Sequence, residues 1–287
     1  MALTSMGPML REACRDGYAV GHFNINNLSF AQAILEAAEQ ERSPVVCAVS
    51  PGYIAHLGGL RTAAAIVRAL VEELGISVPV ALHLDHGSSY EMCMDAIKAG
   101  FSSVMIDASH HPLADNIRIT RQVSEAARAL GVSVEAELGR IGGQEDDLTV
   151  AEEDALHAVP EECEALVRET GVDCLAPALG SVHGPYKGEP KLGFARMADI
   201  RRLTGVPLVL HGGTGIPEPD IRRAISLGTA KINVNTENQI SSTAAIREML
   251  AANPALYDPR QYMDAAREAV KHTVIDKMRL FGSSGKA

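Results

Sequence analysis

Eight short runs of β-branched and aliphatic residues, each followed by a segment of helical period, constrain the fold of this 287-residue chain most strongly. The intervening segments include FAQAILEAAEQE, RTAAAIVRALVEEL, MCMDAIKAG and ECEALVRETG, whose apolar spacing is typical of amphipathic helices. We expect eight buried parallel strands, at Tyr18–Asn24, Val45–Ser50, Val78–Leu84, Ser103–Ala108, Val132–Leu138, Cys174–Leu179, Pro207–His211 and Ala230–Val234.

This alternation favours a closed barrel. A parallel sheet has to be covered by its crossover helices, and closure removes the edges of the sheet. We therefore predict an α/β protein with a single (β/α)8 TIM barrel over residues 1–287, since no Pro/Gly/Ser-rich linker divides the chain. A doubly wound sheet is the alternative, but it usually has fewer strands, and no G-x-G-x-x-G follows the first run. Ser88 and Glu91 predict a capping box at the helix after the third strand.

Charge and composition exclude several function classes. The 26 Lys and Arg residues are outnumbered by 36 Asp and Glu residues, and the formal charge of −10 disfavours a nucleic-acid partner. The five cysteines are odd in number and form no C-x-x-C pair, which indicates reduced packing residues. No signal peptide and no run of about 18 apolar residues is found, so we expect a cytoplasmic protein without membrane contact.

Polar residues stand at the C-terminal ends of nearly all predicted strands, where barrels of this kind carry their chemistry. The residues are Asn24, Asp85, His86, Asp107, Glu137, Ser181, His183, His211, Gly212, Gly213, Thr214, Asn233 and Asn235. Three imidazoles with an open fourth position are the ligand set of a catalytic Zn²⁺. We therefore predict a metal site at His86, His183 and His211, although each histidine alone is equally well explained as a hydrogen-bonded strand-end residue.

We predict structural roles for the remaining histidines and for the one lysine in a predicted strand. His83 lies two residues before Asp85 on the same face of its strand, and we favour a core role for it over one beside the metal. Lys231 is the only lysine within a predicted strand, and its neighbours do not mark it as an activated amine. The histidines without strand-end partners are His22, His56, His110, His111, His157 and His272.

Two glycine-rich segments bear on substrate binding. HGGTG and NVNTE follow the seventh and eighth strands, where barrels commonly bind phosphate through backbone N–H groups. GRIGGQEDD follows the fifth strand and is too polar and glycine-rich to be packed, so it fits a mobile lid that carries Glu145. Composition alone favours a solvated acidic loop at this place.

Together, the motifs HLDHGSS, MIDASHH, VEAELG, GGQEDD, LAPALGSVHGPYKG, PLVLHGGTGIP, KINVNTENQ and YDPR closely resemble the class II, metal-dependent fructose-1,6-bisphosphate aldolases. The resemblance runs from FNINN to FGSSGKA and is greatest for the shorter bacterial subtype close to tagatose-bisphosphate aldolase. It implies reversible cleavage of D-fructose 1,6-bisphosphate to dihydroxyacetone phosphate and D-glyceraldehyde 3-phosphate through a zinc-stabilised enediolate. Tagatose-1,6-bisphosphate or a related phospho-sugar is the alternative substrate; a zinc hydrolase or a catalytically silent phosphosugar sensor are alternatives of another class.

The resemblance also implies a role for each matching residue. Zn²⁺ would be bound by the three histidines already chosen, and Asp85 would handle the proton of the C4 hydroxyl. Glu145 would exchange the proton at C3 of dihydroxyacetone phosphate, which overrides the interpretation of its segment as a solvated loop. Asp107 and Glu137 match positions that hold a second or displaced metal ion, and a monovalent cation such as Na⁺ would lie beside the substrate phosphate.

Ten residues match substrate-binding positions of these aldolases: Asn24, Ser50, Ser181, Gly184, Gly212, Gly213, Thr214, Asn235, Thr236 and Arg260. Arg260 resembles an arginine that reaches a neighbouring active site, so a homodimer or homotetramer is expected. Arg140 occupies a lid position where many relatives have a smaller residue.

Overall fold

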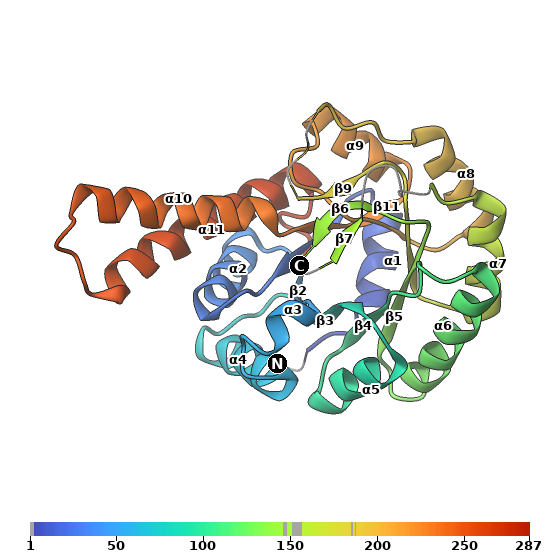
Figure 1. Ribbon diagram of the computed structural model, residues 1–287, viewed down its shortest axis with the longest axis horizontal. Helices are drawn as coiled ribbons and strands as arrows, with labels where there is room; N and C mark the ends of the chain where they lie inside the picture. The colour runs from blue at the N-terminus through green and yellow to red at the C-terminus, as the bar shows by residue number, and fades with distance from the viewer. Residues whose placement is uncertain (1–2, 146–147, 151–156, 185, 187) are drawn as a thin grey trace.

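The computed structural model describes residues 3–145, 148–150, 157–184, 186 and 188–287. Parallel strands close into a barrel in the order β1-β11-β10-β8-β5-β4-β3-β2 (Figure 1). Because β1 pairs with both β2 and β11, the barrel is closed, and the predicted (β/α)8 fold is confirmed over the doubly wound alternative. The strands are β1 (Val20–Asn24), β2 (Val45–Val49), β3 (Val80–Gly87), β4 (Ser103–Ile106), β5 (Ser133–Leu138), β8 (Cys174–Pro177), β10 (Leu208–Leu210) and β11 (Thr229–Val234).

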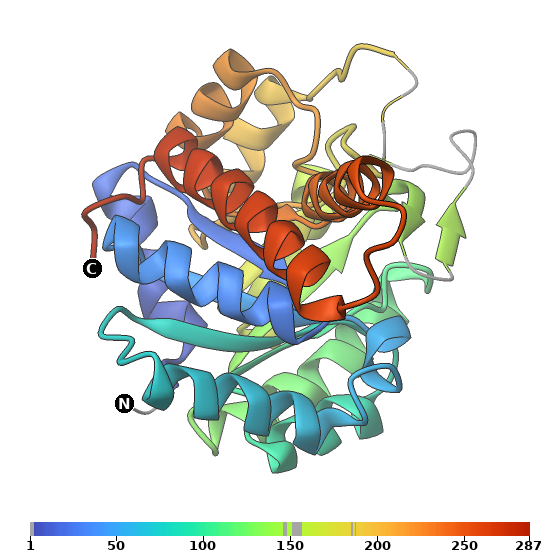
Figure 2. The ribbon, with the colours of Figure 1, turned by 90° about the vertical axis from the view of Figure 1, so that its left-hand side faces the viewer.

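Helices surround the barrel, and one helical hairpin projects from it. The surrounding helices are α2 (Leu28–Glu41), α3 (Pro51–Ile54), α4 (Leu60–Glu73), α5 (Tyr90–Ala99), α6 (Leu113–Arg128), α7 (Pro160–Thr170), α8 (Phe194–Thr204) and α9 (Glu218–Ser226). The hairpin of α10 (Thr236–Ala252) and α11 (Pro259–Phe281) extends outward on the left in Figure 1, and α11 packs beside α2 (Figure 2). Within the described ranges, no helix is both long and apolar enough to cross a bilayer.

The two faces of each strand have different surroundings, because successive side chains of a strand alternate. On β3, Leu82 and Leu84 are fully buried in the large apolar core that also contains residues of the outer helices. Ala81 belongs to a second, inner apolar cluster. His83 and Asp85 continue the inward-facing series of Ala81, so the upper part of the barrel interior is polar.

Helix α1 (Met6–Asp16), which the sequence pattern did not predict, closes the N-terminal end of the barrel. Its buried face packs against the inner apolar cluster. The N–H of Thr4 donates to the carbonyl of Val80, and the N–H of Gly7 donates to Oγ of Ser133, at the first residues of β3 and β5. Reactants therefore have to enter from the opposite, C-terminal end of the strands.

The segment expected to be an unpacked lid contains a strand. β6 (Gly142–Glu145) pairs with β7 (Leu148–Val150) and with β9 (Val182–His183) in a three-stranded sheet above the barrel. Gly143 pairs with His183, and a Cβ on Gly143 would lie 2.1 Å from the carbonyl oxygen of His183. The backbone of Gly143 also has φ +101°, which disfavours residues with a side chain, so its glycine is needed for this close pairing.

The predicted capping box is wrong by one residue. Ser89, not Ser88, is the N-cap of α5, and its side chain accepts a hydrogen bond from the N–H of Met92. β3 extends to Gly87, so the helix starts one residue later than the sequence predicted. The residue three positions after the true cap is therefore Met92, which has no carboxylate to complete the box.

Candidate functional site

Three histidines from different parts of the chain converge at the C-terminal mouth of the barrel. His86 lies near the end of β3, His183 on β9, and His211 directly after β10. The ring centroids are 4.7 Å apart for His86 and His211, 5.3 Å for His86 and His183, and 5.6 Å for His183 and His211. One nitrogen from each ring lies within 4.8 Å of the other two, as a shared metal ion requires.

An irregularity in β3 lets neighbouring residues serve the same site. In a regular strand Asp85 and His86 would point to opposite faces. His86 instead has a φ of +48°, and the register with β4 shifts between Leu84 and Gly87. A left-handed conformation is uncommon for a residue with a side chain and tends to occur where function requires it. Here it allows the His86 ring and the Asp85 carboxylate to occupy the same end of the barrel.

Two carboxylates determine which ring nitrogens carry protons. Asp107 Oδ2 lies 2.9 Å from Nδ1 of His86, and Glu135 Oε1 lies 2.9 Å from Nε2 of His211. An ionised carboxylate only accepts hydrogen bonds, so Nδ1 of His86 and Nε2 of His211 are the donors. Each neutral ring then presents its other nitrogen without a proton. Such carboxylate–histidine pairs are the usual way to orient imidazole ligands.

The two remaining nitrogens, Nε2 of His86 and Nδ1 of His211, lie 3.0 Å apart. A hydrogen bond between them needs an additional proton, whereas a cation attracts both lone pairs at once. Burial lowers the pKa of His211 to about 4 despite its hydrogen bond to Glu135, which favours the neutral form that metals bind. The donor set therefore fits Zn²⁺ and agrees with the prediction at His86, His183 and His211.

Asp85 is fully buried beside this cluster. Its Oδ2 accepts a hydrogen bond from Nδ2 of Asn24 at 3.1 Å and lies 3.3 Å from Nε2 of His22. Burial alone would raise the pKa of Asp85, but the charges of His22 and His86 and the contact with His22 hold it well below its usual value. Its Oδ1 is buried and has no hydrogen-bond partner among the described residues. One carboxylate oxygen is thus held and the other is available for proton transfer.

A second group of possible metal ligands adjoins the three histidines. Ligand atoms of His86, Asp107 and Glu137 lie within 4.8 Å of one another. Burial would raise the pKa of Asp107, but its contacts with His86 and Ser109 lower it below the usual range. A charged carboxylate beside the His86 ring is compatible with the predicted second or displaced metal position.

The predicted phosphate loops meet at the start of α10. Oγ1 of Thr214 accepts a hydrogen bond from the N–H of Glu237, so the loop after β10 contacts the first turn of this helix. Gly212 has φ +64°, and a Cβ there would lie 2.1 Å from the carbonyl oxygen of Val182. A Cβ on Gly213 would lie 2.8 Å from the carbonyl oxygen of Asn233. Small residues and a helix N-terminus at one place make a suitable anion site.

Other predicted substrate residues lie around this site. Ser50 directly follows β2 and Ser181 directly precedes β9, and both are buried. Oγ of Ser50 has no hydrogen-bond partner within the described part of the chain. Asn235 caps α10, and its side-chain oxygen accepts a hydrogen bond from Asn26. Thr236 is the first residue of that helix, and Gly184 follows β9 with φ +85°.

Two predicted residues are not among the side chains that the structure places in this site. The backbone of Glu145 belongs to β6, but its side chain lies outside the described part of the structure. Arg260 is the second residue of α11, beside the loop that joins this helix to α10, at the outer end of the projecting hairpin (Figure 1). Its guanidinium is paired with Asp258 at 2.7 Å, and its side chain is 86% exposed.

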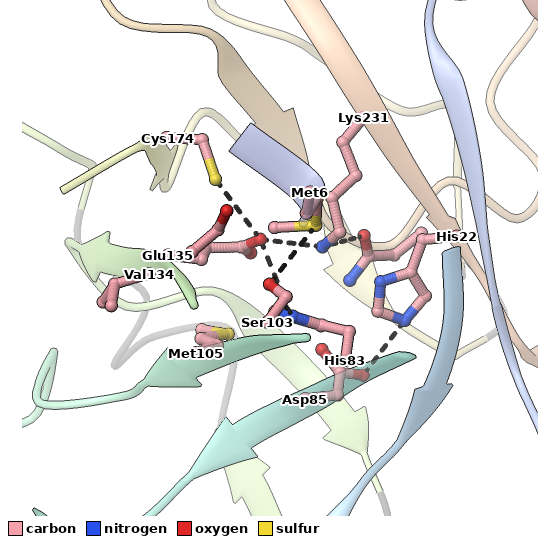
Figure 3. Close-up of polar contacts among 12 residues, drawn as sticks. Met6, His22, His83, Asp85, Ser103, Met105, Val134, Glu135, Cys174 and Lys231 are labelled. Carbon is pink, nitrogen blue, oxygen red and sulfur yellow. Dashed lines mark hydrogen bonds and ion pairs between the residues drawn. The ribbon is translucent and has the colours of Figure 1, made fainter. Parts of the chain in front are cut away.

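A polar layer that the sequence pattern did not predict lies below the histidines. Figure 3 shows His22, His83, Glu135 and Lys231 with their side chains directed toward one another inside the barrel, and all four are fully buried. Alternation placed His83 on the face of Asp85, but no sequence pattern could show that these four side chains meet. Tyr186 was also missed: its hydroxyl donates to the carbonyl of Gly212 and accepts from the N–H of Val182.

Comparisons with known proteins agree with this geometry. The model of the family described as fructose-bisphosphate aldolase class-II matches residues 4–286. The chain is 66% identical to a fructose-bisphosphate aldolase of Geobacillus stearothermophilus over 287 residues, covering 100% of this chain and 99% of that protein. A fructose-bisphosphate aldolase of Staphylococcus aureus strain N315 is 58% identical over the full length of both chains, 287 residues. Among solved structures, the YdjI aldolase of Escherichia coli K12 is 32% identical, with a TM-score of 0.86 and 99% of both chains covered.

Proposed function

Because the chain belongs to the class II fructose-bisphosphate aldolase family, we propose that His86, His183 and His211 bind the zinc ion of an aldol-cleaving active site. The enzyme is an aldehyde-lyase that reversibly cleaves D-fructose 1,6-bisphosphate to dihydroxyacetone phosphate and D-glyceraldehyde 3-phosphate. The observation that carries the zinc assignment is the 3.0 Å approach of two imidazole nitrogens whose rings each donate their proton to a carboxylate.

Asp85 is the proposed acid/base at the C4 hydroxyl. Bound zinc supplies Lewis-acid stabilisation for the negative charge that develops on the substrate when the C3–C4 bond breaks. Asp85 takes the hydroxyl proton with its unpartnered Oδ1, while Asn24 and His22 hold Oδ2 in place. Proton transfer by a positioned carboxylate contributes about 10²- to 10⁴-fold to the rate.

Glu145 is the proposed base for C3. In the synthetic direction it removes a proton from C3 of dihydroxyacetone phosphate, and Asp85 returns a proton to the oxygen at C4. The position of β6 supports this role, because its pairing with β9 brings the backbone of this segment beside His183.

The phosphate at C1 is proposed to bind between the loop after β10 and the start of α10. The close glycine contacts and the N-terminus of α10 support this placement. A monovalent cation such as Na⁺ would be held beside the phosphate by backbone oxygens, and Asn24 and Ser50 would contact the sugar. The proposed phosphate ligands are Ser181, Gly184, Gly212, Gly213, Thr214, Asn235 and Thr236. Asp107 and Glu137 would take the second or displaced metal ion.

Arg260 is proposed to bind the far phosphate in the active site of a neighbouring subunit. Its exposed place at the outer end of the α10–α11 hairpin supports a reach away from its own barrel. The protein would accordingly be a homodimer or homotetramer, with residues 1–287 as one domain in each subunit. Because sugar bisphosphates are cytoplasmic metabolites, we also propose a cytoplasmic location.

A covalent mechanism through a lysine does not fit Lys231. Its ammonium lies 2.9 Å from Oε2 of Glu135 and donates to Oδ1 of Asn233 at 2.9 Å. A Schiff base requires a neutral amine with an available lone pair. Both contacts commit Nζ of Lys231 to polar side chains inside the barrel, so this lysine is not set up as a nucleophile.

Release of triose phosphate from fructose 1,6-bisphosphate tests the proposed function. EDTA should abolish the reaction, and Zn²⁺ or Co²⁺ should restore it, whereas borohydride added with substrate should leave the activity intact. Lysine trapping by borohydride would contradict the metal mechanism, and release of inorganic phosphate without trioses would indicate a hydrolase. Tagatose 1,6-bisphosphate, the C4 epimer, should be turned over more slowly than fructose 1,6-bisphosphate.

A further inference from the structure

We propose that Lys231 is a positioning residue that orients both the metal ligand His211 and the side-chain amide of Asn233. The inference rests on the proposed function, because it assumes that His211 binds the metal. Lys231 lies on β11 and is fully buried in the polar layer shown in Figure 3. Lys231 would act through its contacts with two neighbouring side chains and would not touch the metal itself.

The first arm of this arrangement runs through Glu135. Nζ of Lys231 lies 2.9 Å from Oε2 of Glu135, and the other oxygen, Oε1, lies 2.9 Å from Nε2 of His211. The ammonium fixes one carboxylate oxygen, which turns the other toward the imidazole. An acceptor at Nε2 leaves Nδ1 of His211 as the nitrogen presented to the metal. A rotated Glu135 would remove the constraint that selects this tautomer.

The second arm runs along β11 to Asn233. Nζ of Lys231 donates to Oδ1 of Asn233 at 2.9 Å, two residues along the strand. The amide oxygen is thereby occupied, so the amide nitrogen is the group that remains available to another partner. Nδ2 of Asn233 is buried and has no hydrogen-bond partner among the described residues. A buried donor without a partner at the substrate end of a barrel strand is suited to a substrate oxygen.

Stability alone does not account for this lysine. TIM-barrel interiors are usually filled with branched apolar side chains, and a buried ion pair is often no more stabilising than apolar residues of the same volume. Lys231 and Glu135 are both fully buried, so both carry the cost of desolvation. The geometry instead places one charged group where it orients two functional side chains.

Zinc affinity measures the first arm directly. Lys231→Met preserves the length of the side chain but removes its charge, and Zn²⁺ titration against a chelating dye should show a dissociation constant raised about 10- to 100-fold. The matched control is Lys271→Met, which removes a lysine paired with Glu36 on the outside of the barrel and should leave zinc affinity unchanged. A folded Lys231→Met protein with wild-type zinc affinity would overturn the proposal.

A double variant and a spectrum of the wild type cover the case in which Lys231→Met does not fold. The double variant Lys231→Met/Glu135→Gln buries no unpaired charge. Its kcat/KM at saturating zinc should be at least about 10-fold lower than that of Glu135→Gln alone. The reason is that only the double variant removes the hydrogen bond that holds Asn233. Equal kcat/KM values would refute the second arm. In the ¹⁵N spectrum of the zinc-loaded wild type, His211 should carry its proton on Nε2, and a proton on Nδ1 would refute the first arm.

The metal assignment has a separate control. His211→Asn should bind zinc much more weakly than the wild type, whatever the result for Lys231. Wild-type zinc affinity in His211→Asn would contradict the proposed function. Loss of zinc in His211→Asn together with full affinity in Lys231→Met would refute only the positioning role of Lys231.

Discussion

Nε2 of His86 and Nδ1 of His211 lie 3.0 Å apart, and each ring directs its other nitrogen at a carboxylate. In their neutral forms these imidazoles would face each other with lone pairs, and a shared cation would attract both lone pairs at once. The relationship depends on residues on or directly after β3, β4, β5 and β10, four strands that the closed barrel brings together. It is the structural basis for the proposed zinc site.

Replacement of Asp85 should separate metal binding from catalysis. Asp85→Asn keeps the shape of the side chain and an oxygen that can accept from Asn24, but it cannot take a proton from the C4 hydroxyl. We expect unchanged zinc content and a loss of about 10²- to 10⁴-fold in kcat for cleavage. Metal analysis and triose phosphate release measure the two effects; an active Asp85→Asn enzyme would show that the acid/base is another group.

Glu145→Ala should affect the two proton transfers unequally. Cleavage of the C3–C4 bond depends on Asp85, whereas exchange of the C3 proton of dihydroxyacetone phosphate with solvent depends on Glu145. We expect the variant to retain cleavage better than exchange, measured by loss of deuterium or tritium label from C3. An equal decrease in both rates would argue against Glu145 as the C3 base.

Arg260→Ala should weaken binding of the bisphosphate only. A guanidinium binds a phosphate in bidentate fashion. Dihydroxyacetone phosphate has only one phosphate, so it makes no contact with Arg260 that the substitution could remove. We expect a higher KM for fructose 1,6-bisphosphate and nearly unchanged enolisation of dihydroxyacetone phosphate.

Mixed oligomers test whether Arg260 serves a neighbour. Inactive Asp85→Ala subunits mixed with Arg260→Ala subunits should form some oligomers with one complete site, and activity should rise accordingly. If oligomers proved to be mixed gain no activity, Arg260 does not complete a neighbouring site.

The buried histidines should make the metal-free protein less stable in mild acid. Burial, and then the positive charge of Lys231, lower the pKa of His22, so the unfolded chain binds more protons than the folded chain below the unperturbed pKa of about 6.5. Stability therefore falls with decreasing pH in this window, by up to about 1.4 kcal/mol per pH unit for each such histidine. His22→Gln should reduce this slope in urea unfolding at several pH values, and the exposed His272→Gln should not. Identical slopes for both variants would mean that His22 is charged in the folded state.

The eight strands could be predicted because each is a buried apolar run with its own turn residues. The strand ends indicated the three histidines that the structure brings together. Lys231 shows what the sequence leaves open: its position in a strand was evident, but its partner Glu135 lies 96 residues away, and only the closed barrel brings the two together. The pairing of β6 with β9 was missed for a similar reason. The glycines of β6 are typical of a loop by composition, but they also allow the close backbone contact that this pairing needs. The positive φ of His86 follows from tertiary structure and has no local sequence cue.

The zinc site itself can be tested most directly by anomalous scattering at the zinc absorption edge from crystals of the zinc-loaded enzyme. We expect an anomalous peak for a zinc ion that lies about 2.0–2.1 Å from Nε2 of His86, Nδ1 of His211 and an imidazole nitrogen of His183. The structure also contains a competing set of ligand type, His22, His83 and Asp85, within 4.8 Å of one another. Zinc bound by that set in an active enzyme, with His86, His183 and His211 uncoordinated, would contradict the assignment of these three histidines as the zinc ligands.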